Sequence, residues 1–488
     1  MEQIAEEKTK LYIKAKAGEI NIPKEDPFEN DKLDRKKSAK VLTSAVSAFQ
    51  DGAVIALNGA WGTGKTTFVK MWAQHLDSNG FPVIYYNAWE DDISDEPLIS
   101  LLRNLNGISK KQDGGKLEEV FKAGGRILAG IAIGAAKAAF GKAGEIIAGA
   151  AEGGLDAIQE QFTDSLKEKD EITQTMKKFK KALEEYVAFV CDQGKPLVYF
   201  IDELDRCNPS FAVKVLERIK HLFDVPNVVF VLSIDKQQLA YSINGFYGSE
   251  KIDSMEYLRR FIDIDYNLQE PDPEKYCDYL YDYYSFADFI ESNSRKQVVG
   301  GRVFDDKEGF ISMAKLIVKY KHLNLRQTER IFVLARIALC EMSSTSKLFP
   351  DVLFLLTYLK VCEQVIFESI NALSYRLQEL LDVLEAIATD DLIKEDEKGY
   401  NRYPSVVCHL IICYSESIRV KYKQPDLRYE TIFDENSSDH HSNLVFNKFD
   451  QDLVFSILKY YNERRHFSAC PIGHFTDKIA LLEPFKIE

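Results

Sequence analysis

The chain has 488 residues, of which 45% are hydrophobic, and it carries 24 Tyr and 30 Phe. This composition excludes a wholly disordered protein, and the length indicates about two to four packed modules. A formal net charge of −14 excludes a protein whose main task is to coat nucleic acid; a local basic groove stays compatible with that charge, but no motif indicates one.

The cysteines and the amino terminus indicate where the protein works. The eight cysteines contain no Cys-x-x-Cys pair, and the chain does not begin with a cationic segment followed by an apolar core. Scattered cysteines of this kind are typical of reduced thiols rather than of a disulfide framework. We therefore expect a cytoplasmic protein.

The first strong pattern is a glycine-rich loop between a predicted strand and a predicted helix. Residues 54–57 are apolar, as in a buried parallel strand, and apolar side chains behind the loop repeat at helical spacing. Such a loop turns backbone N–H groups toward a polyphosphate, its lysine reaches the β- and γ-phosphate oxygens, and the next hydroxyl holds Mg²⁺. Lys65 is therefore also a candidate catalytic residue, and Thr66 is a candidate metal ligand. The predicted nucleotide-binding residues are Gly59, Ala60, Trp61, Gly62, Thr63, Gly64, Lys65, Thr66 and Thr67.

A long insertion follows the next predicted strand, which covers residues 81–86 and ends at Asn87-Ala88-Trp89. The acidic motif that would complete a nucleotide site starts only at Asp202. This separation greatly exceeds the roughly 30 residues of one strand–helix–strand unit. We place the insertion at residues 123–193, and we expect the strand at 81–86 to lie beside the strand that carries Asp202.

The insertion begins with a stretch rich in Ala, Gly and Ile at residues 123–151. Its longest uninterrupted apolar run, 127–136, is about half of the roughly 20 residues that a membrane-spanning helix needs, and charged residues interrupt the remainder of the stretch. We therefore expect no spanning helix. Three alternatives stay open: a packed helical hairpin, a subunit contact, and an element that inserts peripherally into a membrane.

Two acids follow a predicted strand of apolar residues at 196–201. Ligands of open α/β sheets bind at the carboxyl ends of the strands, which is where Asp202 and Glu203 stand. Asp202 is expected to hold Mg²⁺ through water, and Glu203 to orient and deprotonate the attacking water. The pair therefore predicts hydrolysis of a nucleoside triphosphate, with capping of the following helix as the structural alternative.

A third predicted strand covers residues 227–235, after a crossover helix at 209–223. It delivers Ser233 and Asp235 to the same edge of the sheet, where either group is a candidate to sense the γ-phosphate or to position water. Capping of the strand is the alternative for Ser233. Asp235 is the preferred candidate and is counted among the catalytic residues.

Beyond residue 270 the pattern becomes mainly helical, with apolar residues at three- and four-residue steps over 311–342 and 352–388. Further helical patterns cover 403–422 and 444–461. No nuclease, protease or deaminase motif is visible in this part. The chemistry predicted by the sequence therefore lies in the first 270 residues, apart from a small set of arginines.

Taken together, these motifs resemble the KAP family of P-loop NTPases, a branch related to AAA+ and STAND proteins. The resemblance covers roughly residues 26–335. The tryptophan in the phosphate loop does most to distinguish this family from other P-loop NTPases. The motifs are Asp31-Lys32-Leu33, Gly59-Ala60-Trp61-Gly62-Thr63-Gly64-Lys65-Thr66, Asn87-Ala88-Trp89, Ile201-Asp202-Glu203-Leu204-Asp205-Arg206-Cys207, Ser233-Ile234-Asp235-Lys236, Tyr257-Leu258-Arg259-Arg260-Phe261 and Asn324-Leu325-Arg326-Gln327-Thr328-Glu329-Arg330.

The resemblance implies an α/β fold: a P-loop NTPase parallel sheet with a helical insertion and a mainly α-helical lid and C-terminal region. The implied modules are residues 1–122 and 194–270 for the two parts of the core, 123–193 for the insertion, 271–345 for the lid and 346–488 for a helical domain of unassigned role. The implied ligands are ATP and Mg²⁺.

The resemblance also implies roles for charged residues. Arg326 and Arg330 lie one helical turn apart in the lid, so Arg326 is the first candidate for a γ-phosphate sensor and Arg330 the second. Asp205 and Arg206 are expected to form an ion pair that braces the helix after Glu203, with contact between Arg206 and a neighbouring subunit's phosphate as the alternative. The pair Arg259-Arg260 departs from the family pattern, which leaves its role open.

The family includes phage-exclusion proteins, and other members are encoded beside effector genes. The resemblance therefore implies an ATPase that works as an oligomeric conformational switch or motor in bacterial antiviral defence, together with an effector protein. The alternative is a slowly hydrolysing signalling scaffold that recruits a partner or a membrane through its helical regions. Membrane contact through residues 123–151 would make the cytoplasmic protein peripheral to a membrane.

Overall fold

A computed structural model describes residues 21–93, 96–108, 113–129, 165–191, 194–248, 253–299, 303–343, 346–394, 399–422, 444–463 and 470–480. They form two compact units, separated between Glu270 and Pro271. We call the first the sheet unit, Glu19–Glu270, and the second the helical unit, whose described residues begin at Pro271.

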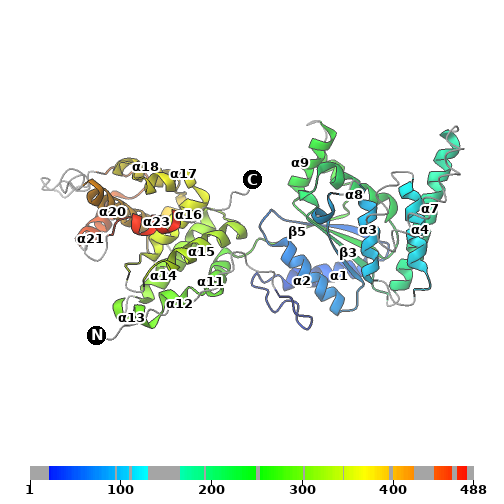
Figure 1. The fold of residues 1–488 in the computed structure, drawn as a ribbon, viewed down its shortest axis with the longest axis horizontal. Helices are drawn as coiled ribbons and strands as arrows, with labels where there is room; N and C mark the ends of the chain where they lie inside the picture. Colours follow the sequence, from blue (N-terminus) through cyan, green and yellow to red (C-terminus); the bar gives the residue numbers. More distant parts are fainter. Residues whose placement is uncertain are drawn as a thin grey trace. The chain divides into compact units, whose positions relative to one another are not determined.

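The sheet unit is built on five parallel strands in the order β2-β3-β4-β1-β5 (Figure 1). Every residue of the two strands β3 and β4 is buried, which explains their continuous apolar sequences. As predicted, β2 lies beside β3. The strands are β1 (Ala53–Asn58), β2 (Val83–Asn87), β3 (Leu197–Asp202), β4 (Val228–Ile234) and β5 (Ile264–Asn267).

Strand β5 was not predicted from the sequence. It has four residues, in which half-buried Ile264 and Tyr266 alternate with exposed Asp265 and Asn267. Such a short alternating segment gives little signal by itself. Pairing with β1 at the edge of the sheet makes it a strand.

Helices cover both faces of the sheet and make two hydrophobic cores. One core joins α1 (Lys36–Ala48) and α2 (Lys65–Ser78) to one face, where the buried Trp72 ring packs edge-on against Phe200 with ring centroids 5.0 Å apart. The opposite face is covered by α3 (Pro97–Leu105), α8 (Pro209–Leu222), α9 (Lys236–Tyr247) and α10 (Ser254–Leu258). The unit is therefore a three-layer α/β structure, and the predicted fold class is confirmed.

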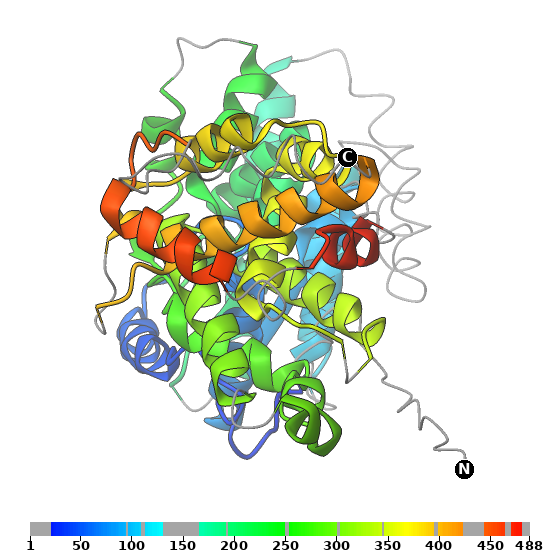
Figure 2. The same ribbon diagram turned by 90° about the vertical axis from the view of Figure 1, so that its left-hand side faces the viewer.

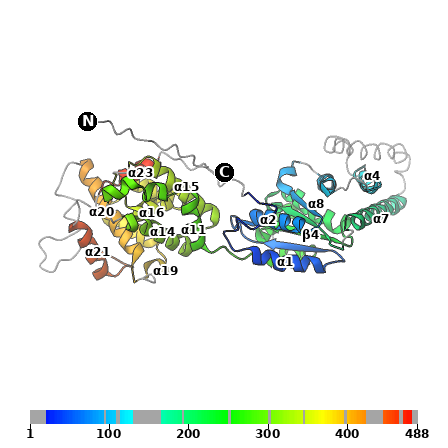
Figure 3. The same ribbon diagram turned by 90° about the horizontal axis from the view of Figure 1, so that it is seen from below.

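The described ends of the predicted insertion pack on the second core. These are α4 (Lys116–Ala129) and α7 (Ser165–Val190), which contact each other and lie side by side in Figure 3. Buried Phe121 and Phe179 belong to the same hydrophobic core as the sheet. The stretch at 130–151, for which membrane contact was considered, lies outside the described residues. Among the residues that are described, no helix is both long and apolar enough to cross a membrane.

The helical unit consists of packed α-helices. Helix α16 contacts α14, α15 and α20, and Figure 2 shows α20 and α21, coloured orange to red, beside each other. The helices are α11 (Pro273–Tyr283), α12 (Ala287–Ile290), α13 (Asn293–Val299), α14 (Val303–Tyr320), α15 (Leu325–Cys340), α16 (Pro350–Cys362), α17 (Gln364–Asn371), α18 (Leu377–Ala386), α19 (Asp390–Ile393), α20 (Arg402–Tyr422), α21 (Gln451–Glu463) and α23 (Gly473–Ala480).

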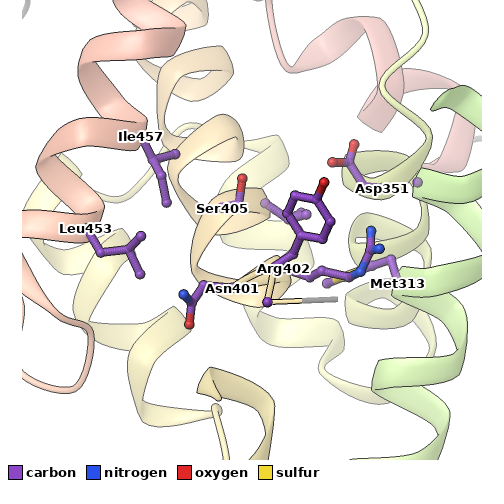
Figure 4. A pocket seen from close by; sticks show the side chains of 11 residues that line it. Met313, Asp351, Asn401, Arg402, Ser405, Leu453 and Ile457 are labelled. Atoms are coloured by element: carbon purple, nitrogen blue, oxygen red, sulfur yellow. The ribbon is translucent and has the colours of Figure 1, made fainter. Parts of the chain in front are cut away.

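A pocket of about 280 Å³ lies within the helical unit, between α14, α16, α20 and α21 (Figure 4). Its wall combines apolar side chains such as Met313 and Leu453 with Asp351 and Arg402. Arg402 also pairs with Glu308 at 3.4 Å. Charges of both signs in one small pocket do not select an anionic or a cationic ligand.

Candidate functional site

The sheet topology brings polar residues from separate parts of the chain to one edge. In the strand register Asn87 of β2 lies opposite Asp202 of β3, and Asp202 lies opposite Ser233 of β4. The end of β1, which leads into the phosphate loop, is the next strand along. Both predicted halves of the nucleotide site therefore meet at the carboxyl edge of the sheet.

The phosphate loop joins β1 to α2, and its conformation depends on glycine. Gly62 and Gly64 have φ of 80° and 82°, a left-handed region that favours glycine. The loop is fixed at its start, because the Gly59 amide donates to the Ile234 carbonyl at 3.2 Å. It is also fixed within, since the Thr63 hydroxyl donates to the Ala60 carbonyl at 2.8 Å. The loop ends at the N-terminus of α2, which is a favourable place for an anion.

Lys65 is the first residue of α2, and only 8% of its surface is exposed. Its ammonium donates to the Gly59 carbonyl at 2.5 Å and to the Ala60 carbonyl at 3.2 Å. Burial lowers the pKa of Lys65, while the carboxylates of Asp205, Asp235 and Asp202 oppose that shift. The ammonium thus lies inside the loop, among acids that favour its charged form. Thr66 and Thr67 follow it in the first turn of α2 and are partly buried.

Asp202 is almost fully buried at the end of β3, and both of its oxygens are engaged. One accepts from the Tyr85 hydroxyl at 3.0 Å and the other from the Glu203 amide at 3.0 Å. Burial and the negative charge of Asp202 raise the pKa of Tyr85, so the hydroxyl stays a donor. Tyr85 was not singled out from the sequence, because only the pairing of β2 with β3 brings it to Asp202.

Thr66 and Asp202 fit a magnesium site of the kind that a nucleotide completes. A hydroxyl and a carboxylate oxygen are ligands that suit Mg²⁺, which usually keeps several waters and binds phosphate oxygens as well. Among the described residues, no group of three or more His, Cys, Asp or Glu side chains is placed to hold a metal ion by itself.

Glu203 follows Asp202 in a left-handed conformation, with φ of 61°. This backbone is unusual for a residue other than glycine, and such positions concentrate at functional sites. The Glu203 carboxylate pairs with the Arg206 guanidinium at 2.9 Å. Burial raises the pKa of Glu203, and the positive charge of Arg206 opposes the rise.

The predicted ion pair between Asp205 and Arg206 is wrong. Arg206 turns toward Glu203 instead, and its guanidinium lies 5.6 Å from the centre of the Trp89 ring. The buried Asp205 carboxylate accepts from the Trp61 indole N–H at 2.6 Å and from the Asp235 amide at 2.9 Å. The indole and the amide lie far from Asp205 in sequence, so neighbouring residues give no sign of this choice.

The carboxylate of Asp235 caps α9 by accepting from the amides of Gln237 and Gln238 at 3.1 and 3.2 Å. Capping explains its position at the helix start. The Ser233 hydroxyl is buried at the same edge and has no hydrogen-bond partner among the described residues. The catalytic role of Asp235 and the sensor role of Ser233 stay predictions.

A model of the KAP family P-loop domain matches residues 35–388, which is more than half of the chain. The chain belongs to the KAP family of P-loop NTPases. The recognition made from the motifs is thereby confirmed. A comparison with curated proteins finds no significant match. Membership of the KAP family supports nucleotide binding at the loop between β1 and α2.

The four arginines considered for the KAP site lie in both units. Arg259 pairs with Glu256 at 2.8 Å on the surface of the sheet unit, and Arg260 next to it is exposed. Arg326 and Arg330 lie on α15 of the helical unit, where Arg326 is exposed and Arg330 is half-buried. Their roles as sensors stay predictions.

One further residue of the KAP domain contacts the phosphate loop and was not predicted. Arg35 precedes α1, and its guanidinium donates to the carbonyls of Thr63 and Gly64 at 2.6 and 3.1 Å. The motif Asp31-Lys32-Leu33 just before Arg35 carries part of the family resemblance, but it assigns Arg35 no role. Nothing in that pattern indicates contact with a loop 28 residues away.

Proposed function

We propose that this KAP protein binds ATP with Mg²⁺ and hydrolyses it. The observation that carries the proposal is the position of Glu203: it stands beside Asp202 at the carboxyl edge of the sheet, and burial raises the pKa of its carboxyl group. A carboxylate with a raised pKa is a better proton acceptor at neutral pH. The phosphate loop follows β1, which only β4 separates from β3 in the sheet, and we expect this loop to bind the triphosphate.

Each residue of the site then has a task. Lys65 exchanges the carbonyls of Gly59 and Ala60 for phosphate oxygens, which are stronger acceptors because they are charged. Asp202 and Thr66 would hold Mg²⁺, which supplies charge neutralisation at the phosphates. The ion pair at 2.9 Å with Arg206 lowers the basicity of Glu203, so we expect the carboxylate to accept a proton from water more readily when Arg206 turns away.

The cellular role in the proposal rests on the family resemblance. Hydrolysis would drive a conformational switch or motor in a homo-oligomer, with a neighbouring subunit's arginine or the lid residues Arg326 and Arg330 sensing the γ-phosphate. The oligomer would act with an effector protein in antiviral defence. Loss of protection against phage on substitution of Glu203, with the protein still expressed, would support that role; retained protection would exclude a need for hydrolysis.

The test of the biochemical function uses Glu203→Gln and Lys65→Ala in the full chain. Glu203→Gln removes the base and keeps the shape, so we expect phosphate release to fall about 10²- to 10⁴-fold with ATP affinity retained. Lys65→Ala is expected to weaken ATP binding itself. Particle mass with and without ATP reports on the oligomer. Negligible turnover by the wild type, with nucleotide-dependent binding of a partner, would favour the scaffold alternative.

A further inference from the structure

Arg35 is a charged residue with an unusual environment, because only 4% of its surface is exposed. It stands at the N-cap of α1, whose first turn is fixed by Asp31: this carboxylate accepts from the amides of Arg35 and Lys36 at 2.6 and 2.9 Å. The side chain of Arg35 is not needed for that cap. It is instead directed into the sheet unit.

The partners of the guanidinium are backbone carbonyls from two distant segments. It donates to Thr63 at 2.6 Å, to Gly64 at 3.1 Å and to Gln269 at 3.3 Å. Its Nε has no partner among the described residues. Burial lowers the pKa of Arg35 to about 10, so the side chain is still charged at neutral pH. The negative charge of Asp31 opposes this shift, but the hydrogen-bond partners of the guanidinium are carbonyls, so the burial of this charge calls for an explanation.

The position of these carbonyls suggests an explanation for the buried charge of Arg35. A phosphate loop turns its N–H groups toward the ligand, which directs carbonyls such as those of Thr63 and Gly64 elsewhere. Arg35 engages both of them directly before α2 begins at Lys65. Its charge therefore supports the loop from behind, where it favours an anion without contacting it. Gln269, the third partner, stands two residues before the helical unit begins at Pro271.

We propose that Arg35 is a positioning residue of the nucleotide site: it holds the phosphate loop ready for a triphosphate and fastens the segment that leads to the helical unit onto the back of that loop. This inference rests on the proposed binding of ATP at the loop. It predicts that Arg35 couples the loop to the linker, in addition to the bond that the Leu268 amide donates to the Asn58 carbonyl at 2.8 Å, so that loss of the guanidinium loosens both segments.

The test compares Arg35→Met and Arg35→Lys with the wild type in the full chain. Methionine keeps much of the length and removes the charge, whereas lysine keeps the charge but cannot span three carbonyls. We expect Arg35→Met to weaken the binding of a fluorescent ATP analogue about ten- to a hundredfold, because it removes charged hydrogen bonds that fix the loop. Arg35→Lys is expected to restore part of this loss. In steady-state hydrolysis KM should rise more than kcat falls.

Hydrogen exchange without nucleotide provides a second measurement, which does not depend on ATP binding. In both variants we expect faster exchange in peptides that cover residues 59–67 and 264–272. Arg218→Lys is the matched control, because Arg218 is a largely buried arginine of the same unit that pairs with Glu96 at 2.9 Å outside the site. It is expected to lower stability and to leave ATP affinity within about twofold.

The outcomes separate this inference from the proposed function. Failure of the wild type to bind ATP would refute the function, while the exchange comparison still tests Arg35. If both Arg35 variants fold, bind ATP within about twofold of the wild type and show unchanged exchange, Arg35 has no positioning role. Faster exchange in the loop alone would refute the connection to the linker.

Discussion

The contact between Trp61 and Asp205 offers a direct test of how the phosphate loop is held. We consider Asp205→Ala, which removes the acceptor of both the Trp61 indole N–H and the Asp235 amide. A hydrogen bond to a charged group contributes about 1.5–3 kcal/mol when it is buried. Since the Trp61 side chain is 43% exposed, water can replace most of its bond. We therefore expect a loss of about 2–3 kcal/mol in the free energy of unfolding of the sheet unit, mainly through the Asp235 amide.

Tryptophan fluorescence during denaturant unfolding measures this loss for the sheet unit alone. All three tryptophans of the chain, Trp61, Trp72 and Trp89, lie in that unit, and the fully buried Trp72 reports on its core. Asp265→Ala is the control, because Asp265 is a half-exposed partner of Lys236 at 2.6 Å on the same sheet. Because water reaches the half-exposed Asp265 carboxylate, we expect its removal to cost about 1 kcal/mol.

One result would refute the reasoning. If Asp205→Ala changes the free energy of unfolding by less than about 0.5 kcal/mol, like an ordinary surface substitution, then the carboxylate does not hold the loop and the start of α9 together. Asp205→Asn refines the test, since it keeps an oxygen acceptor and loses the charge. The free energy of unfolding of Asp205→Asn is expected to lie between those of the wild type and Asp205→Ala.

Two further predictions concern Glu203 and Glu96. Burial raises the pKa of Glu203, and the positive charge of Arg206 opposes that rise, so Arg206→Met should raise the pKa further. The acid limb of the kcat/KM profile for ATP hydrolysis should then move to higher pH. An unchanged acid limb would mean that Glu203 is not the group that titrates. Glu96→Gln should cost about 2–3 kcal/mol in unfolding free energy, because it leaves the largely buried Arg218 without its carboxylate. ATP affinity should not change in Glu96→Gln, and a large loss of affinity would show that this pair acts on the site.

Sequence and structure agree most closely where the pattern is local. The phosphate loop is recognised because its glycines, Lys65 and Thr66 are consecutive, and β3 because an apolar run ends in two acids. Both patterns reflect backbone requirements that neighbouring residues satisfy: positive φ at Gly62 and Gly64, and burial on both faces of a central parallel strand. The helical pattern predicted over 311–342 gave no sign of the break between α14 and α15, although Asn324 and Gln327 form a capping box at the start of α15.

The prediction from sequence failed where a side chain has more than one possible partner. Arg206 was expected to pair with Asp205, the nearest acid in sequence, yet it pairs with Glu203 because Asp205 is occupied by Trp61, 144 residues away. Adjacent opposite charges need not pair, and here the buried Asp205 carboxylate accepts from the Trp61 indole and the Asp235 amide instead. Tyr85 was not predicted as a site residue, because its contact with Asp202 exists only once β2 and β3 pair.

The sequence by itself determined that Gly59 to Thr66 form a phosphate loop and that Asp202 and Glu203 follow a buried strand, because each feature is encoded in consecutive residues. It also carried enough motifs to identify the KAP family. Only the tertiary structure decided what surrounds the loop. Strand order brought Asp205 to Trp61, and the burial of Arg35 placed a guanidinium between the loop and Gln269. These contacts join segments that are distant in sequence. Their energies depend on how far folding buries both partners, which the local sequence does not determine.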